Sequence, residues 1–263
     1  MPCLRIAYDG SHFFGSQRQP DLRTVENDIL DVLIKTGYIK DTSELDVFRM
    51  ASRTDKGVSA RQNLLNIVCG KDSDLVANNR LDRMNDLLND IWITGYSPQE
   101  FHGKVDKTYH YHLINDDFGK ENITLLCKVF SGTHDFSAFS KINPAKEPVR
   151  VIDIDFLYGD DVITLQFKGR GFLWQMCRRI ANAFIMNLNG ELGMEDIISM
   201  LENRTSAKIK PASPLNLILY GMDSDLHLEE VKSGFESMYN HYEDKRSRAI
   251  LEKRISSYML PGL

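Results

Sequence analysis

The order in which two hydrophobic repeats alternate along the chain constrains the fold more than any other feature. Runs with apolar residues at every second position predict strands, and runs with a 3.6-residue repeat predict helices. The first hundred residues give the order strand, helix, strand, strand, helix, strand. These segments are strands at Leu4–Tyr8, Val47–Ser52, Gln62–Val68 and Ile91–Tyr96, a helix capped by Thr24, and a helix marked by Leu81, Met84, Leu87 and Leu88.

The second half of the chain repeats this order. It has predicted strands at Thr108–Ile114, Val149–Leu157, Val162–Lys168 and Leu215–Tyr220, and helices near His134–Ser140, over Leu173–Phe184 and over Met194–Asn203. Two such βαββαβ units predict an α+β fold of two ferredoxin-like halves, whose largely antiparallel sheets flank a central active-site cleft. We expect residues 1–103 and 104–263 to form the two domains, with a C-terminal helix over residues 228–255.

Composition and cysteine spacing narrow the class of protein. The 263 residues carry a net charge of −5, which argues against indiscriminate binding to polyanions. No run approaches the roughly 18 apolar residues of a membrane span, and no leader segment precedes the first strand, so we expect a cytoplasmic protein. The four cysteines form no Cys-x-x-Cys pair, so neither a structural zinc site nor a disulfide framework is predicted; they are Cys3, Cys69, Cys127 and Cys177.

The run Ala51–Ala60 holds the first candidate for chemistry. Asp55 lies between Arg53 and Lys56, and Gly57 follows two residues later. Neighbouring cations favour the charged form of a carboxylate, and glycine lets a backbone approach a ligand closely. An Asp-Lys-Gly turn is more often an ordinary surface turn, so this spacing alone leaves both interpretations open.

Two further segments carry residues suited to a nucleotide site. On the segment Lys107–Tyr111, alternation places Tyr109 and Tyr111 on one face, where they serve either as core residues or as a platform for a base. On the helix after Gly171, Arg178 lies at the border of the apolar face. Its guanidinium either reaches a cleft or forms, with Arg179, a solvated pair on the surface.

With these segments in place, the chain resembles the tRNA pseudouridine synthase A (TruA) family over about residues 4–221. The resemblance is collinear across many short motifs. They are Ile6–Gly10, Phe14–Gln19, Arg23–Glu26, Ser52–Ala60, Phe101–Gly103, Lys107–Tyr111, His134–Phe139, Phe172–Arg178 and Pro211–Leu215. In this family, the aspartate that matches Asp55 is the essential catalytic residue, and the tyrosine that matches Tyr109 contacts the target base.

The resemblance implies conversion of uridine to pseudouridine in tRNA, at positions 38–40 of the anticodon arm, by a homodimer that needs no cofactor and no metal. Asp55 would act as the nucleophile toward ribose or uracil, or as a base at the 2′ position. Arg178 would hold the Asp55 carboxylate, and Tyr109 would stack on the flipped base. The candidates for binding the RNA are Arg53, Lys56, Arg61, Lys168 and Arg170, with Lys104, Lys141 and Arg179 as further members of a basic face.

The chain departs from the family's pattern at three places. Ser16 stands where tryptophan is common, and Gly103 stands where alanine is usual, both in loops expected to touch RNA. Only 22 residues separate Tyr111 from His134, which is short for the family. These departures keep two alternatives open: a pseudouridine synthase acting on another tRNA position or another RNA, and a catalytically silent RNA-binding or tRNA-chaperone protein.

Overall fold

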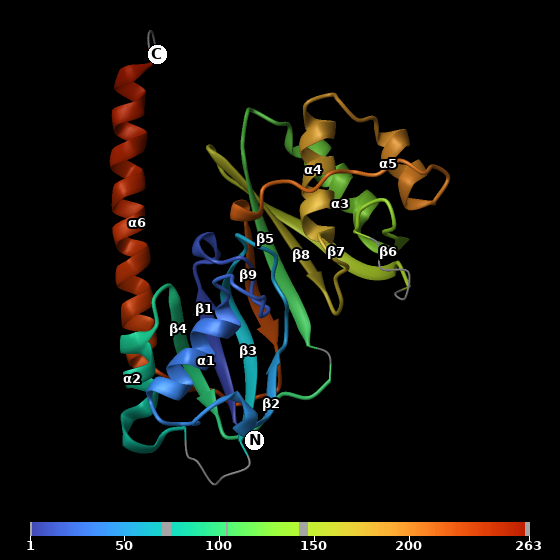
Figure 1. The fold of residues 1–263 in the computed structure, drawn as a ribbon. Coiled ribbons are helices and arrows are strands. Elements are labelled where there is room, and N and C mark those ends of the chain that lie inside the picture. The colour runs from blue at the N-terminus through green and yellow to red at the C-terminus, as the bar shows by residue number, and fades with distance from the viewer. Residues whose placement is uncertain (1, 70–74, 104, 142–146, 261–263) are drawn as a thin grey trace.

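The computed structural model describes residues 2–69, 75–103, 105–141 and 147–260, and these form a mixed α+β fold around one large sheet (Figure 1). The ten strands are β1 Cys3–Tyr8, β2 Leu45–Met50, β3 Ser59–Cys69, β4 Ile91–Ser97, β5 Asp106–Ile114, β6 Gly132–Asp135, β7 Val149–Tyr158, β8 Val162–Gly169, β9 Leu217–Asp223 and β10 Glu229–Glu230. The six α-helices are α1 Val25–Lys35, α2 Arg80–Leu87, α3 Lys120–Phe130, α4 Met176–Leu188, α5 Met194–Leu201 and α6 Lys232–Met259.

The strand order across the sheet is β10-β4-β1-β3-β9-β5-β8-β7-β6, and β2 pairs with β3 beside this path. Within the described residues, every neighbouring pair is antiparallel except β3 and β9, which run parallel. The parallel pair joins Ser59 to Ile218 and Ala60 to Leu219. The two halves of the chain are therefore joined in one continuous sheet immediately after the Asp55 loop.

Local sequence signals account for most of these elements. Thr24 caps α1, because its hydroxyl accepts a hydrogen bond from the backbone N–H of Asn27. Alternation along β5 buries Tyr109 and Tyr111 under the helices of the second half. In Figure 1, α1 and α2 lie beside β1–β4, whereas α3, α4 and α5 lie beside β5–β8.

The predicted helix near His134–Ser140 is wrong. Gly132–Asp135 is strand β6 at the edge of the sheet, and the helix of this region is α3, which ends at Phe130. The apolar face of α3 has the spacing of a buried helix, and all four of its residues are buried; they are Ile123, Leu126, Cys127 and Phe130. The short segment between Tyr111 and His134 therefore holds a complete helix.

Helix α4 begins later than its apolar repeat predicts. Leu173 precedes the helix, which starts at Met176 after Gln175 takes a left-handed backbone conformation, with φ of 63°. This conformation is uncommon for a residue other than glycine, and it turns the chain sharply just before the helix. As a result, Trp174 lies on a loop and not on the first turn of the helix.

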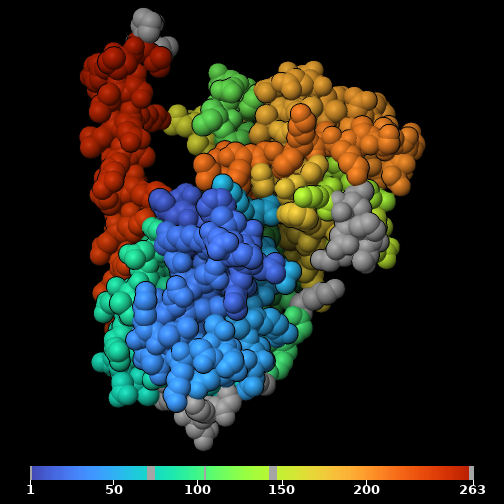
Figure 2. Space-filling model, viewed as in Figure 1, coloured from blue at the N-terminus to red at the C-terminus, as the bar shows by residue number. Residues whose placement is uncertain are grey.

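Helix α6 confirms the predicted C-terminal helix and extends beyond the body of the molecule. Its first half packs on β4 and α2, and Gly234 fits there because a Cβ would lie 1.9 Å from the carbonyl oxygen of Ile93. Its second half extends beyond the body in Figure 2, and its apolar residues Ile250, Leu251 and Ile255 are exposed. Lys253 in this half forms an ion pair of 2.6 Å with Asp161, between β7 and β8. In the part of the chain that the structure describes, no helix is both long and apolar enough to cross a membrane.

Candidate active site

The loop that carries Asp55 is fixed by its neighbours on both sides. The backbone N–H of Thr54 donates to the hydroxyl of Ser16 at 2.9 Å, and the N–H of Ser16 donates to the carbonyl oxygen of Thr54 at 3.1 Å. The hydroxyls of Thr54 and Tyr8 are hydrogen-bonded at 2.9 Å. Ser16 is completely buried, so it supports this loop and does not lie on an RNA-contacting surface as the sequence suggested.

Both carboxylate oxygens of Asp55 have a hydrogen-bond donor. The Nη1 of Arg178 lies 2.9 Å from Oδ2, and the indole Nε1 of Trp174 lies 2.9 Å from Oδ1. The side chains of Arg178 and Asp55 are 11% and 22% exposed, so the ion pair is shielded from water but not sealed. Partial burial of this kind strengthens a charge-assisted hydrogen bond.

The backbone around Ala212 holds Arg178 in place. The Nε of Arg178 donates to the carbonyl oxygen of Ala212 at 2.8 Å, and the N–H of Ala212 donates to the carbonyl oxygen of Arg178 at 3.0 Å. The next residues cover the Asp55 loop at Gly57, where φ is +83° and a Cβ would lie 3.1 Å from the ring of Pro214. Three segments that are distant in sequence therefore meet at one carboxylate.

Tyr109 is buried in the core and hydrogen-bonded to Ser52, three residues before Asp55. Its hydroxyl is hydrogen-bonded to the hydroxyl of Ser52 at 2.9 Å, and its ring meets the ring of Phe172 edge-on, with centroids 5.2 Å apart. Burial raises the pKa of the Tyr109 phenol far above its usual value, so the hydroxyl stays protonated. Ser52 is held in turn by the side-chain amide of Asn63, which bonds both its N–H and its carbonyl oxygen.

The predicted RNA-binding cations divide between the two faces of the sheet. Arg53 and Lys56 are exposed on the Asp55 loop, where the Lys56 ammonium lies 4.0 Å from the centroid of the Phe14 ring. Arg61 and Lys168 line a groove with His110, on the face opposite to Tyr109, and acidic residues share that groove. The structure therefore does not bring Arg61 and Lys168 to the Asp55 site.

The remaining basic candidates differ in what their side chains contact. Arg170 is exposed and forms a two-point ion pair with Asp106, with distances of 3.1 and 3.2 Å. Arg179 is part of the scaffold, because its guanidinium donates to the carbonyl oxygen of Ile209 and to the side chain of Gln175. The Lys141 ammonium lies 3.9 Å from the ring centroid of Trp174. Lys104 lies outside the described residues.

The sequence alone did not indicate a role for Trp174, Ser52 or Asn63 at this site. Trp174 was placed within a motif without a role, and because it lies on the loop before α4, the helical repeat gave no sign that it reaches Asp55. Ser52 and Asn63 carried no signal, since a buried serine and asparagine are recognised only once their hydrogen bonds are known. Trp174 thus holds the Asp55 carboxylate, whereas Ser52 and Asn63 hold the Tyr109 phenol.

The chain is similar to known proteins over most of its length. Residues 126–223 match a family model described as tRNA pseudouridine synthase. Proteins named tRNA pseudouridine synthase A are similar over nearly the whole chain. The one from Thermococcus onnurineus is 38% identical over 99% of this chain and 98% of its own length, and the one from Methanothermobacter thermautotrophicus is 32% identical over 97% and 90%.

A solved structure is similar at a much lower level. It is a chain of the archaeal box H/ACA sRNP Nop10-Cbf5 complex, with a TM-score of 0.35 and 11% identity, covering 70% of this chain and 43% of that one. The similarity of sequence to the tRNA pseudouridine synthases is far stronger, and the matched residues include Arg178 and Ala212.

Proposed function

Because the chain belongs to the tRNA pseudouridine synthase family and is an RNA pseudouridine synthase, we propose that it isomerises uridines at positions 38–40 of the tRNA anticodon arm. The anticodon target follows from the family resemblance. The observation that carries the catalytic assignment is the contact of 2.9 Å between Arg178 and Asp55. It joins the Asp55 loop to the helix that follows Gly171, the two segments in which the family resemblance places the catalytic site.

The reaction needs few groups. The N1–C1′ bond of uridine breaks, the uracil turns, C5 bonds to C1′, and the proton on C5 is lost while N1 gains one. Asp55 acts either as the nucleophile, toward ribose C1′ or uracil, or as a base at the 2′ position. Arg178 orients the carboxylate and stabilises its charge, because its guanidinium is held by Ala212 and is shielded from water.

Tyr109 is proposed to contact the uracil from below. Its raised pKa means that the phenol remains neutral, so it is a hydrogen-bonding contact to the uracil, and its hydroxyl is held by Ser52. Its ring is covered by neighbouring side chains, and Phe172 meets it edge-on. Flipping the base out of the stem costs a few kcal/mol. The flipped base then has to displace part of the cover over the Tyr109 ring before it can stack there.

The proposal extends to the assembly and to the domains. The strand orders β4-β1-β3-β2 and β9-β5-β8-β7 support our interpretation of residues 1–103 and 104–263 as two ferredoxin-like domains.

We also propose a homodimer that binds one tRNA with both subunits. Arg53, Lys56, Lys141 and Arg170 lie on exposed segments, where they can bind the phosphate backbone of the RNA.

The test is pseudouridine mapping by carbodiimide labelling of an unmodified tRNA transcript treated with the purified protein alone. We expect new reverse-transcription stops in the anticodon arm, and their loss in Asp55→Asn with RNA binding retained. Stops at other positions would overturn the anticodon target while leaving the enzyme class unchanged. Full turnover by Asp55→Asn would overturn the catalytic assignment. Binding without any stops would favour the silent RNA-binding alternative.

A further inference from the structure

Trp174 is an exposed aromatic residue that is hydrogen-bonded to the proposed catalytic carboxylate. Its side chain lies on the loop before α4, and 54% of the residue is accessible to solvent. Its indole N–H nevertheless donates to Oδ1 of Asp55 at 2.9 Å. An exposed indole that donates to a reactive carboxylate lies where a ligand that reaches this carboxylate has to pass, and its ring can stack on a base.

A lysine holds the indole from another direction. The Lys141 ammonium lies 3.9 Å from the ring centroid, which is within the range of a cation–π interaction, and the Lys141 N–H donates to the carbonyl oxygen of Trp174 at 2.9 Å. The indole therefore has one edge on Asp55 and a cation near its ring, with the rest of its surface in solvent. Both contacts are ones that an RNA strand can replace, since its phosphates attract Lys141 and its bases have π-faces.

The hydrogen bond to Oδ1 conflicts with the chemistry of the site. Oδ2 is already bonded to Arg178, so Oδ1 is the oxygen left to act as nucleophile or base, and Trp174 occupies it. The indole N–H has to leave Oδ1 before this oxygen can react. The same movement would bring the ring to the entrance of the site, where the flipped uracil arrives.

We propose that Trp174 is a substrate-positioning residue: it covers Asp55 in the free protein and stacks on the uracil when the base enters. The inference rests on the proposed function, since it assumes that uridine is flipped toward Asp55. Stacking of Trp174 on the uracil would then exist only in the occupied site, and its hydrogen bond to Asp55 only in the free site. It also gives Lys141 a specific task, which is to release the indole when a phosphate binds.

Fluorescence follows this movement directly, because the chain has two tryptophans. Trp92 is buried on β4, far along the sheet from α4, and Trp92→Phe leaves Trp174 as the single indole. In this variant we expect a saturable emission change with an anticodon-arm transcript that contains uridine. A transcript with cytidine at those positions should bind without that change. Trp174→Phe, which retains Trp92, is the matched control and should give no response.

Kinetics separate the two roles of the indole. Trp174→Leu removes the stacking surface and should raise KM about tenfold, with kcat changed less than about threefold. Trp174→Phe keeps an aromatic face but loses the N–H, so its KM should stay within about threefold of the natural protein if that bond exists only in the free state. Thermal unfolding of both variants at unchanged temperature would show that the fold is intact.

The outcomes distinguish this inference from the function on which it rests. A protein that forms pseudouridine while the Trp174 emission stays constant, or changes equally with the cytidine transcript, would overturn the inference and leave the function standing. A fall in kcat of Trp174→Phe by more than about tenfold would also overturn it, because the N–H would then act in the reaction. If the natural protein formed no pseudouridine, the proposed function itself would be wrong, whatever the Trp174 emission showed.

Discussion

Arg178 and Asp55 are 123 positions apart in the chain, yet their side chains meet at 2.9 Å. The same guanidinium donates through Nε to the carbonyl oxygen of Ala212, so it bridges the Asp55 loop and the segment before β9. A planar fork with several donors can make both bonds at once, whereas a single ammonium group cannot. The geometry of this one side chain therefore determines where the carboxylate points.

We expect Arg178→Lys to lower kcat about 10- to 100-fold, because one hydrogen bond to a charged group is lost, worth about 1.5–3 kcal/mol. The lysine keeps the positive charge, so RNA binding should change little. Single-turnover kinetics with a saturating tRNA transcript measure the effect. Arg83→Lys, on the exposed face of α2, is the matched control and should behave like the natural protein. A single-turnover rate constant for Arg178→Lys within about twofold of that of the natural protein would show that the two-bond geometry of the guanidinium is not needed.

A second prediction concerns Gly10, whose backbone packs closely against the end of the Asp55 loop. A Cβ at Gly10 would lie 2.1 Å from the carbonyl oxygen of Val58, a residue of that loop. We expect Gly10→Ala to destabilise the protein by about 2–3 kcal/mol and to lower activity further, since the loop has to shift. Gly221→Ala, where no atom lies within 4 Å of the added Cβ, is the control. Urea unfolding and pseudouridine formation measure the two effects.

Much of this fold could be predicted from local signals. The hairpin of β7 and β8 follows from two alternating runs around Gly159, and Thr24 caps α1 as predicted. The proximity of Arg178 to Asp55 was open from the helical repeat alone, and the family resemblance supplied it. The hairpin and the helix cap each depend on a few neighbouring residues, so a short window of sequence contains the necessary information for both.

Other features depend on contacts that no short window contains. The parallel pairing of β3 with β9 joins Ser59 to Ile218, and it needs the whole second half to be folded. Arg61 and Lys168 were predicted to share one RNA-binding basic face with Lys56 and Arg170, but alternation along β3 and β8 places them on the face of the sheet opposite to Tyr109. Helix α3 was not predicted, although its buried residues Ile123, Leu126, Cys127 and Phe130 recur at helical spacing.

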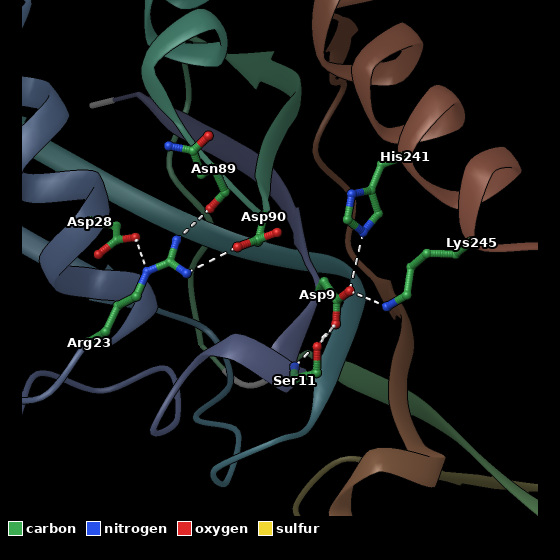
Figure 3. A network of polar contacts seen from close by, with 8 residues as sticks. All are labelled: Asp9, Ser11, Arg23, Asp28, Asn89, Asp90, His241 and Lys245. Carbon is green, nitrogen blue, oxygen red and sulfur yellow. Dashed lines mark hydrogen bonds and ion pairs between the residues drawn. The ribbon is translucent and has the colours of Figure 1, made fainter. Parts of the chain in front are cut away.

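A third prediction concerns the attachment of α6 to the body. Figure 3 shows the Asp9 carboxylate with Lys245 and His241 of α6, at 2.5 and 3.2 Å from the same oxygen. The Asp9 side chain is only 3% exposed, whereas Asp161, the partner of Lys253, is 74% exposed. We expect Lys245→Met to reduce the free energy of unfolding by about 1–2 kcal/mol, discounted because Lys245 is half-exposed, and Lys253→Met by less than about 0.5 kcal/mol. Equal effects in urea unfolding would contradict this assignment.

The same contact predicts how stability depends on pH. Burial on its own raises the pKa of Asp9, but hydrogen bonds from Lys245, Ser11 and His241 outweigh it and hold this pKa well below the usual range. A carboxyl whose pKa is depressed by folding stabilises the protein above its unfolded pKa, about 3.9, and this contribution is lost as the pH falls toward the folded pKa. The stability difference between the natural protein and Lys245→Met should therefore be constant from about pH 5 to 7 and shrink below about pH 4. Urea unfolding of both proteins across this range measures it, and a difference that grew on acidification would show that Asp9 does not carry the interaction.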